Sequence, residues 1–306
     1  MRTGKYKWQA LLLAVLATVA SAALQAQNGI ATVDLGGGFT LVQGAGANVV
    51  VAEGPDSIVI VDGGTLARAD VLMAEINRLT GNKPVAALFN TNWRPERTGL
   101  NHLLGPQEVS IIAHENTRLW QGIDINAAWQ DITYQPLPKS AQANSTFYTV
   151  ASMTLGDELI EYGFISQGST DGDIYVHFRN ADILVVGDML GTNAYPLLDY
   201  VTGGWIGGAQ KTTAGLLELA NDDTRVIAAT GGVLGKADLQ DQAVMLDHAY
   251  SKVAEAFKTG RSLEQFRESN PMEGFAEKWG SPELFLQLLY KGTWYHVPGR
   301  AVPGII

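Results

Sequence analysis

The chain has 306 residues, of which 46% are hydrophobic and 8% aromatic, a composition typical of a globular protein with a sizeable core. Its formal net charge of −10 argues against nucleic acid and anionic membrane surfaces as partners, because both attract basic proteins. No cysteine is present, which excludes a disulfide scaffold and leaves stability to the core.

The first 26 residues have the pattern of a secretory signal peptide. Arg2, Lys5 and Lys7 precede an apolar run over residues 10–24 that ends in small side chains, and this run is short for a membrane span. An uncleaved membrane anchor is the alternative. Removing residues 1–26 takes away three positive charges and no negative ones, so the net charge becomes −10 − 3 = −13. We therefore expect a periplasmic or secreted protein formed by residues 27–306, with no membrane association after cleavage.

Strands and helices alternate in the first half of the mature chain. Short strands separated by glycine-rich turns come first, followed by a helix whose apolar residues recur at helical spacing and then by a buried strand. The expected strands span 39–42, 48–52, 57–61, 85–89 and 109–113, and the expected helices span 66–79 and 98–104.

The second half has the same order of elements and ends in a helical region from about 236 to 306. The expected strands span 147–155, 159–164, 173–178, 183–186 and 225–229, and the expected helices span 212–220, 244–257, 262–267 and 281–289. Two successive β-then-α halves predict an α/β protein in which two sheets pack together with helices outside, an αββα sandwich.

Polar segments follow several of the predicted strands. Residues 90–101, Asn-Thr-Asn-Trp-Arg-Pro-Glu-Arg-Thr-Gly-Leu-Asn, turn directly from a buried strand into charged side chains. The other segments are 60–64 (Ile-Val-Asp-Gly-Gly), 168–173 (Gly-Ser-Thr-Asp-Gly-Asp), 186–188 (Val-Gly-Asp) and 228–231 (Ala-Ala-Thr-Gly). Together with the strand at 48–51 they resemble the metallo-β-lactamase superfamily over nearly the whole mature chain. The resemblance implies the fold of that family, with two mixed sheets face to face and helices outside.

The same resemblance aligns a set of residues with the family's zinc ligands, which are mostly histidines. They are Asn92, Arg94 and Ser169 for the first metal, and Glu96, Arg97, Thr230 and Asp188 for the second. A zinc site needs roughly three or four N, S or O donors. Arginine keeps its proton, and amide or hydroxyl oxygens are weak zinc donors, so only the two carboxylates remain. We therefore expect no cofactor, and no catalytic residue can be assigned.

The arginines in this loop are suited to replace the charge of the missing metals. Arg94 and Arg97 can form paired hydrogen bonds with carboxylates, so we hypothesise a network of these residues with Glu96 and Asp188. The alternative is that both arginines point to solvent. If a different metal is held instead, zinc included, its weak candidate ligands are Glu96, Asp188 and Asp171.

Ligand-binding candidates surround these positions. Arginines with aromatic side chains can hold a planar or anionic ligand, and the residues chosen on this basis are Arg94, Arg97, Trp93, His114 and Tyr195. Other aromatic residues that could line a cleft are Trp120, Trp129 and Trp205. All of these aromatics could equally be core residues, and His114 could cap the next helix. Asp62, Asp171 and Asp173 are expected to shape loops and bond to backbone amides.

Two functional hypotheses follow. The first is a pseudo-hydrolase of the cell envelope that has lost its zinc ligands and binds a small anionic ligand, or a protein partner, in the former cleft. The second is a superfamily hydrolase of a lactam, thioester or phosphoester bond with an atypical metal site.

Overall fold

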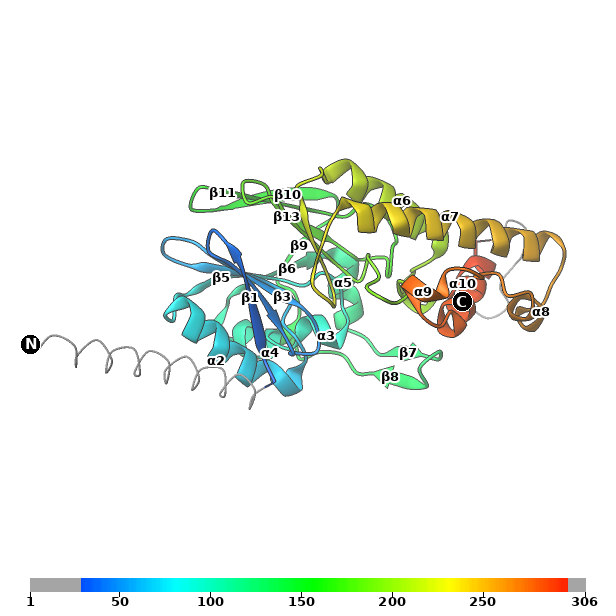
Figure 1. Cartoon of the computed structure of the whole chain (residues 1–306). Coiled ribbons are helices and arrows are strands. Elements are labelled where there is room, and N and C mark those ends of the chain that lie inside the picture. The colour runs from blue at the N-terminus through cyan, green and yellow to red at the C-terminus, as the bar shows by residue number, and fades with distance from the viewer. Residues whose placement is uncertain (1–28, 297–306) are drawn as a thin grey trace, which may run out of the picture.

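Two β-sheets packed face to face form the centre of the computed structural model, which describes residues 29–296 (Figure 1). The predicted signal peptide therefore lies outside the described residues. The arrangement is the αββα sandwich predicted from the sequence, with one sheet from each half of the chain. Within residues 29–296, no helix has the length and apolar character that a membrane crossing requires.

The first sheet has the order β1-β2-β3-β4-β5-β6-β9. Its strands are β1 (Ala31–Gly36), β2 (Phe39–Gln43), β3 (Val49–Glu53), β4 (Ile58–Val61), β5 (Val85–Phe89), β6 (Ser110–His114) and β9 (Ser145–Phe147). Strands β1 to β4 pair antiparallel, whereas β4, β5, β6 and β9 run parallel to one another. The carboxyl ends of these four parallel strands therefore meet at one edge of the sheet.

The second sheet has the order β10-β11-β12-β13-β14-β15. Its strands are β10 (Val150–Leu155), β11 (Glu158–Gly163), β12 (Tyr175–Phe178), β13 (Ile183–Gly187), β14 (Arg225–Ala228) and β15 (Val233–Leu234). Only β13 and β14 are parallel, and α6 (Ile206–Leu219) connects them. A separate hairpin, β7 (Ile125–Ala127) with β8 (Ile132–Tyr134), projects on the side of the C-terminal helices (Figure 1).

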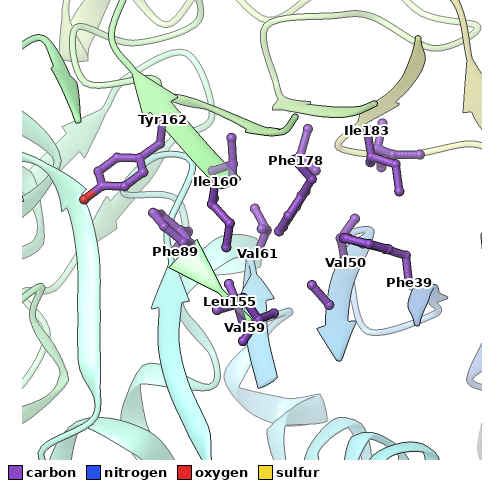
Figure 2. Packing of buried hydrophobic residues seen from close by; sticks show 14 of the residues in the cluster. Phe39, Val50, Val59, Val61, Phe89, Leu155, Ile160, Tyr162, Phe178 and Ile183 are labelled. Atoms are coloured by element: carbon purple, nitrogen blue, oxygen red, sulfur yellow. The ribbon is translucent and has the colours of Figure 1, made fainter. Parts of the chain in front are cut away.

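Alternating residues of both sheets meet in one apolar core. Phe39, Val50 and Phe89 of the first sheet face Ile160 and Phe178 of the second (Figure 2). The rings of Phe39 and Phe178 meet edge to face, with centroids 4.9 Å apart. Truncating a fully buried phenylalanine such as Phe178 to alanine costs about 3–5 kcal/mol, so this layer fixes the relation of the two sheets and of the loops at their edge.

Helices cover the outer face of each sheet. On the first sheet lie α2 (Ala69–Thr80) and α4 (Asn101–Leu104), through Leu72 and Leu104. Helix α3 (Pro95–Thr98) lies in the segment after β5, and α5 (Glu115–Gln121) directly follows β6. On the second lie α6 and the start of α7 (Lys236–Lys258), through Leu216 and Leu239. The rest of α7 packs with α8 (Leu263–Glu268), α9 (Ala276–Trp279) and α10 (Glu283–Trp294) around a third apolar cluster that includes Ile206 of α6. Short 3-10 turns are η1 (Leu66–Arg68), η2 (Gly105–Gln107), η3 (Lys139–Ala141) and η4 (Tyr200–Thr202).

Two expected elements are corrected by the structure. The strand predicted over 147–155 is two strands, because the chain crosses from the first sheet (β9) to the second (β10) at residues 148 and 149. The helix predicted over 98–104 is interrupted at Gly99, whose backbone N–H donates to the Gly64 carbonyl at 2.7 Å. A side chain at Gly99 would collide with the backbone of Gly64 and Thr65, so glycine permits this close approach.

Candidate functional site

Polar side chains gather where β4, β5 and β13 end. Asn92, which follows β5, donates from Nδ2 to Asp188 Oδ2 at 2.8 Å and to Asp173 Oδ1 at 3.1 Å. Its Oδ1 accepts the backbone N–H of Arg94 at 3.0 Å. The amide of Asn92 therefore links the end of the first sheet to two carboxylates of the second, at a position that the sequence resemblance gives to a metal ligand.

Arg97 forms the central ion pair of the site. Its Nη2 lies 2.7 Å from Asp188 Oδ1 and its Nε 3.2 Å from Asp188 Oδ2, a two-point contact with only 4% of the arginine side chain exposed. Asp62 is a second carboxylate, with Oδ2 3.7 Å from Arg97 Nε. The predicted pairing of Arg97 with Asp188 is present, and the hypothesis that this arginine points to solvent is wrong.

Asp62 also holds the loop in place. Its Oδ1 accepts the backbone N–H of Thr91 at 2.8 Å, as expected from the sequence. Gly63, next in the chain, donates to the Arg97 carbonyl at 2.8 Å. A side chain at Gly63 would meet the backbone N of Leu100, so the Asp-Gly-Gly turn fixes the end of α3 and with it the position of Arg97.

Burial and charge set the protonation of these groups. Burial raises the pKa of Asp62 to about 7, although Arg97 and Thr91 oppose the shift. Burial likewise raises the pKa of Asp173 to about 7. Burial also disfavours the charged form of Asp188, but Arg97, Arg94 and Asn92 together outweigh it and keep the pKa of Asp188 below its usual value. At neutral pH the site therefore contains a stable Arg97–Asp188 ion pair flanked by two carboxyls that burial makes easier to protonate.

Arg94 is held differently from Arg97. Its guanidinium carbon lies 5.6 Å from the ring centroid of Trp93 and 5.7 Å from that of Trp129, and its side chain is 9% exposed. The nearest carboxylates, Glu96 and Asp199, are both 3.8 Å away, beyond hydrogen-bond distance. The Nη1 group of Arg94 is buried and has no hydrogen-bond partner in the described structure. Arg94 and Glu96 thus form the expected ion pair, with Nε and Oε2 3.8 Å apart, but the paired hydrogen bonds expected between them are absent.

Asp199 is not free to bond Arg94 because other donors occupy it. Its carboxylate accepts from Trp129 Nε1 at 3.0 Å, from Thr202 Oγ1 at 3.0 Å and from the Val201 backbone N–H at 3.2 Å. Burial raises the pKa of Asp199 despite these bonds and the nearby arginine. Neither Asp199 nor its contact with Trp129 was expected from the sequence, since no pattern around residue 199 distinguishes it from an ordinary turn aspartate.

Three of the other candidate positions differ in their surroundings. Ser169 is buried and its Oγ has no hydrogen-bond partner in the described structure, while its carbonyl accepts the Asp199 backbone N–H at 2.9 Å. The Glu96 side chain is 36% exposed, and its Oε2 also lacks a hydrogen bond. Thr230 is exposed. Arg94, Glu96 and Ser169 thus carry buried polar atoms that the described residues leave unsatisfied.

The remaining candidates belong to the surrounding structure. His114 caps α5 by accepting the Asn116 backbone N–H at Nδ1, and its Nε2 bonds the Tyr148 carbonyl at 3.2 Å. Both of its ring nitrogens are therefore in use, which argues against a ligand-binding role. The ring of Tyr195 stacks on Phe285 with centroids 4.6 Å apart, inside the C-terminal apolar cluster.

Solved structures with this architecture provide the comparison. The DIM-1 metallo-β-lactamase is 18% identical to this chain, with a TM-score of 0.57 over 72% of this chain and 98% of that one. A metallo-β-lactamase from Pontibacter korlensis is 16% identical, with a TM-score of 0.58 over 71% and 99%. This chain has the metallo-β-lactamase fold.

A longer part of the chain matches another enzyme of this fold. The stereoselective inverting sec-alkylsulfatase Pisa1 from Pseudomonas sp. is 12% identical, with a TM-score of 0.66 over 86% of this chain and 50% of that one. No protein-family model and no curated protein sequence matches the chain.

The metallo-β-lactamase fold implies zinc, and the residues described above do not fit a zinc centre. Residues 29–296 contain no group of three or more His, Cys, Asp or Glu side chains placed to hold a metal ion. The weak candidates are not gathered either: Asp188 is paired with Arg97, and Asp171 Oδ1 accepts Trp120 Nε1 at 2.7 Å. A guanidinium bonded to Asp188 puts a fixed positive charge where a cation would have to bind.

Proposed function

We propose that the protein is a metal-independent pseudo-hydrolase of the cell envelope that binds a small oxyanion, such as a carboxylate, sulfate or phosphate group, at Arg94. The export-like N-terminus motivates the proposed location. The observation that carries the proposed activity is the Nη1 group of Arg94, which is buried between two tryptophan rings without a hydrogen-bond partner in the described structure, Asp199 Oδ2 being 3.8 Å away.

A buried charged donor without an acceptor costs roughly 1–3 kcal/mol or more, so a ligand that supplies one gains that amount on binding. The planar guanidinium is suited to a planar or tetrahedral oxyanion because it can donate two parallel N–H bonds. Trp93 and Trp129 fix the plane of Arg94 in advance, which lowers the entropy lost on binding.

The two carboxylates near Arg94 would repel a bound anion, but neither of them accepts a hydrogen bond from the Arg94 guanidinium. Asp199 has its oxygens bonded to Trp129, Thr202 and a backbone amide, and burial raises its pKa. Glu96 is partly exposed, so solvent screens its repulsion. A direct bond from an anion to Arg94 would outweigh these two screened interactions, because charge-assisted hydrogen bonds contribute roughly 1.5–3 kcal/mol each.

The test is a thermal-shift titration with acetate, sulfate and phosphate on four proteins. These are the unmodified chain, Arg94→Gln, Arg94→Lys and Arg78→Gln. Arg78 is the matched control, since its side chain is 55% exposed on α2 and already paired with Glu75. A ligand at a hundred times its Kd stabilises a protein by about 2.7 kcal/mol.

We expect one of these anions to stabilise the unmodified chain and Arg78→Gln, to act weakly on Arg94→Lys and to leave Arg94→Gln unchanged. Melting curves without ligand establish that Arg94→Gln is folded. Equal shifts in Arg94→Gln and Arg78→Gln would overturn the proposal. So would near-stoichiometric metal in protein purified without chelator, together with turnover of lactams, thioesters or phosphoesters.

A further inference from the structure

A cavity of about 160 Å³ lies beside the Arg94 loop, under the β7–β8 hairpin. Three aromatic and three aliphatic side chains form half of the residues that line it: Trp93, Trp120, Tyr134, Leu66, Ile125 and Leu137. None of these six residues is at a position aligned with a zinc ligand. The cavity is therefore a feature of this chain that the comparison with metal-binding relatives does not explain.

The three aromatic residues present apolar ring surface to this cavity, because their N–H and O–H groups donate hydrogen bonds to other residues. The bonds run from Trp93 Nε1 to Thr202 Oγ1 at 3.1 Å, from Trp120 Nε1 to Asp171 Oδ1 at 2.7 Å and from Tyr134 OH to Gln130 Oε1 at 2.9 Å. The cavity also contacts His102, for which burial lowers the imidazole pKa, so this side chain is neutral at pH 7. An occupant would meet mainly apolar surface, together with the uncharged polar side chains of Thr98, Gln121 and Gln135.

Trp93 connects the cavity to the anion site. Arg94 lies over its ring, the Tyr134 ring meets it edge-on with centroids 5.3 Å apart, and Pro95 continues the cavity wall from the residue after Arg94. The rim is open to solvent, because Leu66 is 56% exposed. A molecule can therefore enter the cavity without unfolding the hairpin.

We propose that this cavity is the apolar subsite of the ligand that binds Arg94. The ligand class is an organic anion: a carboxylate, sulfate or phosphate joined by a short linker to one aromatic ring or branched alkyl group. The size follows from the volume, since a cavity of about 150 Å³ lined by apolar side chains accommodates benzene. This inference rests on the proposed function and adds the uncharged half of the ligand.

The test compares acetate with phenylacetate, 3-phenylpropionate and 4-phenylbutyrate, and includes benzyl alcohol as an uncharged probe. Affinities come from calorimetry, and the indole N–H signals of Trp93 and Trp120 report where each probe lies. Burying a benzene-sized group raises affinity by about tenfold to a hundredfold. We therefore expect at least one phenyl acid to bind about tenfold or more tighter than acetate.

Substitutions at the rim test whether the gain in affinity of the phenyl acids over acetate comes from the cavity. Leu66→Trp and Leu137→Trp place a larger ring at the cavity wall and are expected to bring the phenyl acids back to the affinity of acetate. Leu119→Trp is the matched control, because Leu119 is also exposed, at 52%, but lies outside the cavity. It should keep the full gain.

The outcomes separate the two proposals. If acetate binds through Arg94 but no phenyl acid binds tighter, or if both rim variants keep the gain, the apolar subsite is wrong and the anion site stands. If benzyl alcohol shifts the indole signals while the binding of no anion depends on Arg94, the proposed function is wrong. The proposal that the cavity and Arg94 bind one ligand is then wrong as well.

Discussion

Replacing Asp188 by alanine removes one half of the ion pair at the centre of the site. The carboxylate accepts Arg97 Nη2 at 2.7 Å, Arg97 Nε at 3.2 Å and Asn92 Nδ2 at 2.8 Å. In Asp188→Ala the guanidinium stays in a place where 4% of its side chain is exposed, with Asp62 3.7 Å away as the remaining carboxylate. The perturbation therefore leaves a buried charge with a weaker partner.

The expected loss of stability is at the lower end of the range for such a change. Removing one partner of a buried ion pair lowers the free energy of unfolding by about 3–5 kcal/mol, because the other charge stays buried and unpaired. Asp62 offsets part of this, because two unit charges about 4 Å apart still attract by about 4 kcal/mol at an effective dielectric constant near 20. Asp62 also loses the repulsion of Asp188, which favours its charged form. We expect a loss of about 3 kcal/mol, or roughly 6–12 °C in Tm for a domain of this size.

Urea unfolding followed by circular dichroism measures this loss, on Asp188→Ala, on Arg97→Met and on the double variant. Because the two side chains are in contact, the double variant should lose less stability than the sum of the single variants. Asp241→Ala is the control: Asp241 pairs with Lys278 at the surface, is 57% exposed, and should contribute less than about 1 kcal/mol. A loss below about 1 kcal/mol in Asp188→Ala, equal to that of Asp241→Ala, would refute the buried pair.

Two further predictions concern the same edge of the sheets. Because the folded-state pKa values of Asp62 and Asp173, about 7, exceed the usual 3.8, the folded protein binds more protons than the unfolded chain between these values. Their contribution to stability is therefore complete below pH 3.8, falls as pH rises through the pKa near 7 and is lost above it. Urea midpoints from pH 5 to 8 should decline less steeply in Asp62→Asn than in the unmodified chain, and an unchanged slope would contradict the shift. Gly187→Ala places a side chain at a residue whose φ is 54°, with the new Cβ 2.5 Å from Thr91 Oγ1. We expect the free energy of unfolding, measured with urea, to fall by about 1–3 kcal/mol, and wild-type stability would contradict the strain.

Strands and their order were predictable because hydrophobic periodicity and glycine turns are local signals. The predicted strand at 85–89 matches β5 at both ends, and the polar residues after it lie in the site. The crossing between sheets at residues 148 and 149 was missed, because an unbroken run of strand-forming residues contains no sign of which sheet each part joins. Only tertiary contacts separate β9 from β10.

Side-chain pairings in the site were predictable only where the resemblance constrained both partners. Arg97 and Asp188 occupy aligned positions, and their contact follows. Arg94 and Glu96 are two residues apart at the start of a short helix and approach only to 3.8 Å, without a hydrogen bond, and Arg94 also lies between Trp93 and Trp129. The Trp129 contact joins residues far apart in sequence, which composition and spacing do not reveal.

The charge balance explains why the two arginines behave differently. Two divalent metals would supply about four positive charges to the carboxylates at this edge, whereas Arg94 and Arg97 supply two. The charge of Arg97 is neutralised by Asp188. Among the described residues, Asp62 and Asp173 lack a comparable cationic partner, and burial raises the pKa of each, so that they are protonated more easily than ordinary carboxyls. Because these carboxyls meet the deficit by binding protons, none of them draws Arg94 into a close bond. Its Nη1, which lies 3.8 Å from Asp199 Oδ2 and has no hydrogen-bond partner in the described structure, is thus a consequence of replacing the metals incompletely, and it is where we propose that an added negative charge binds.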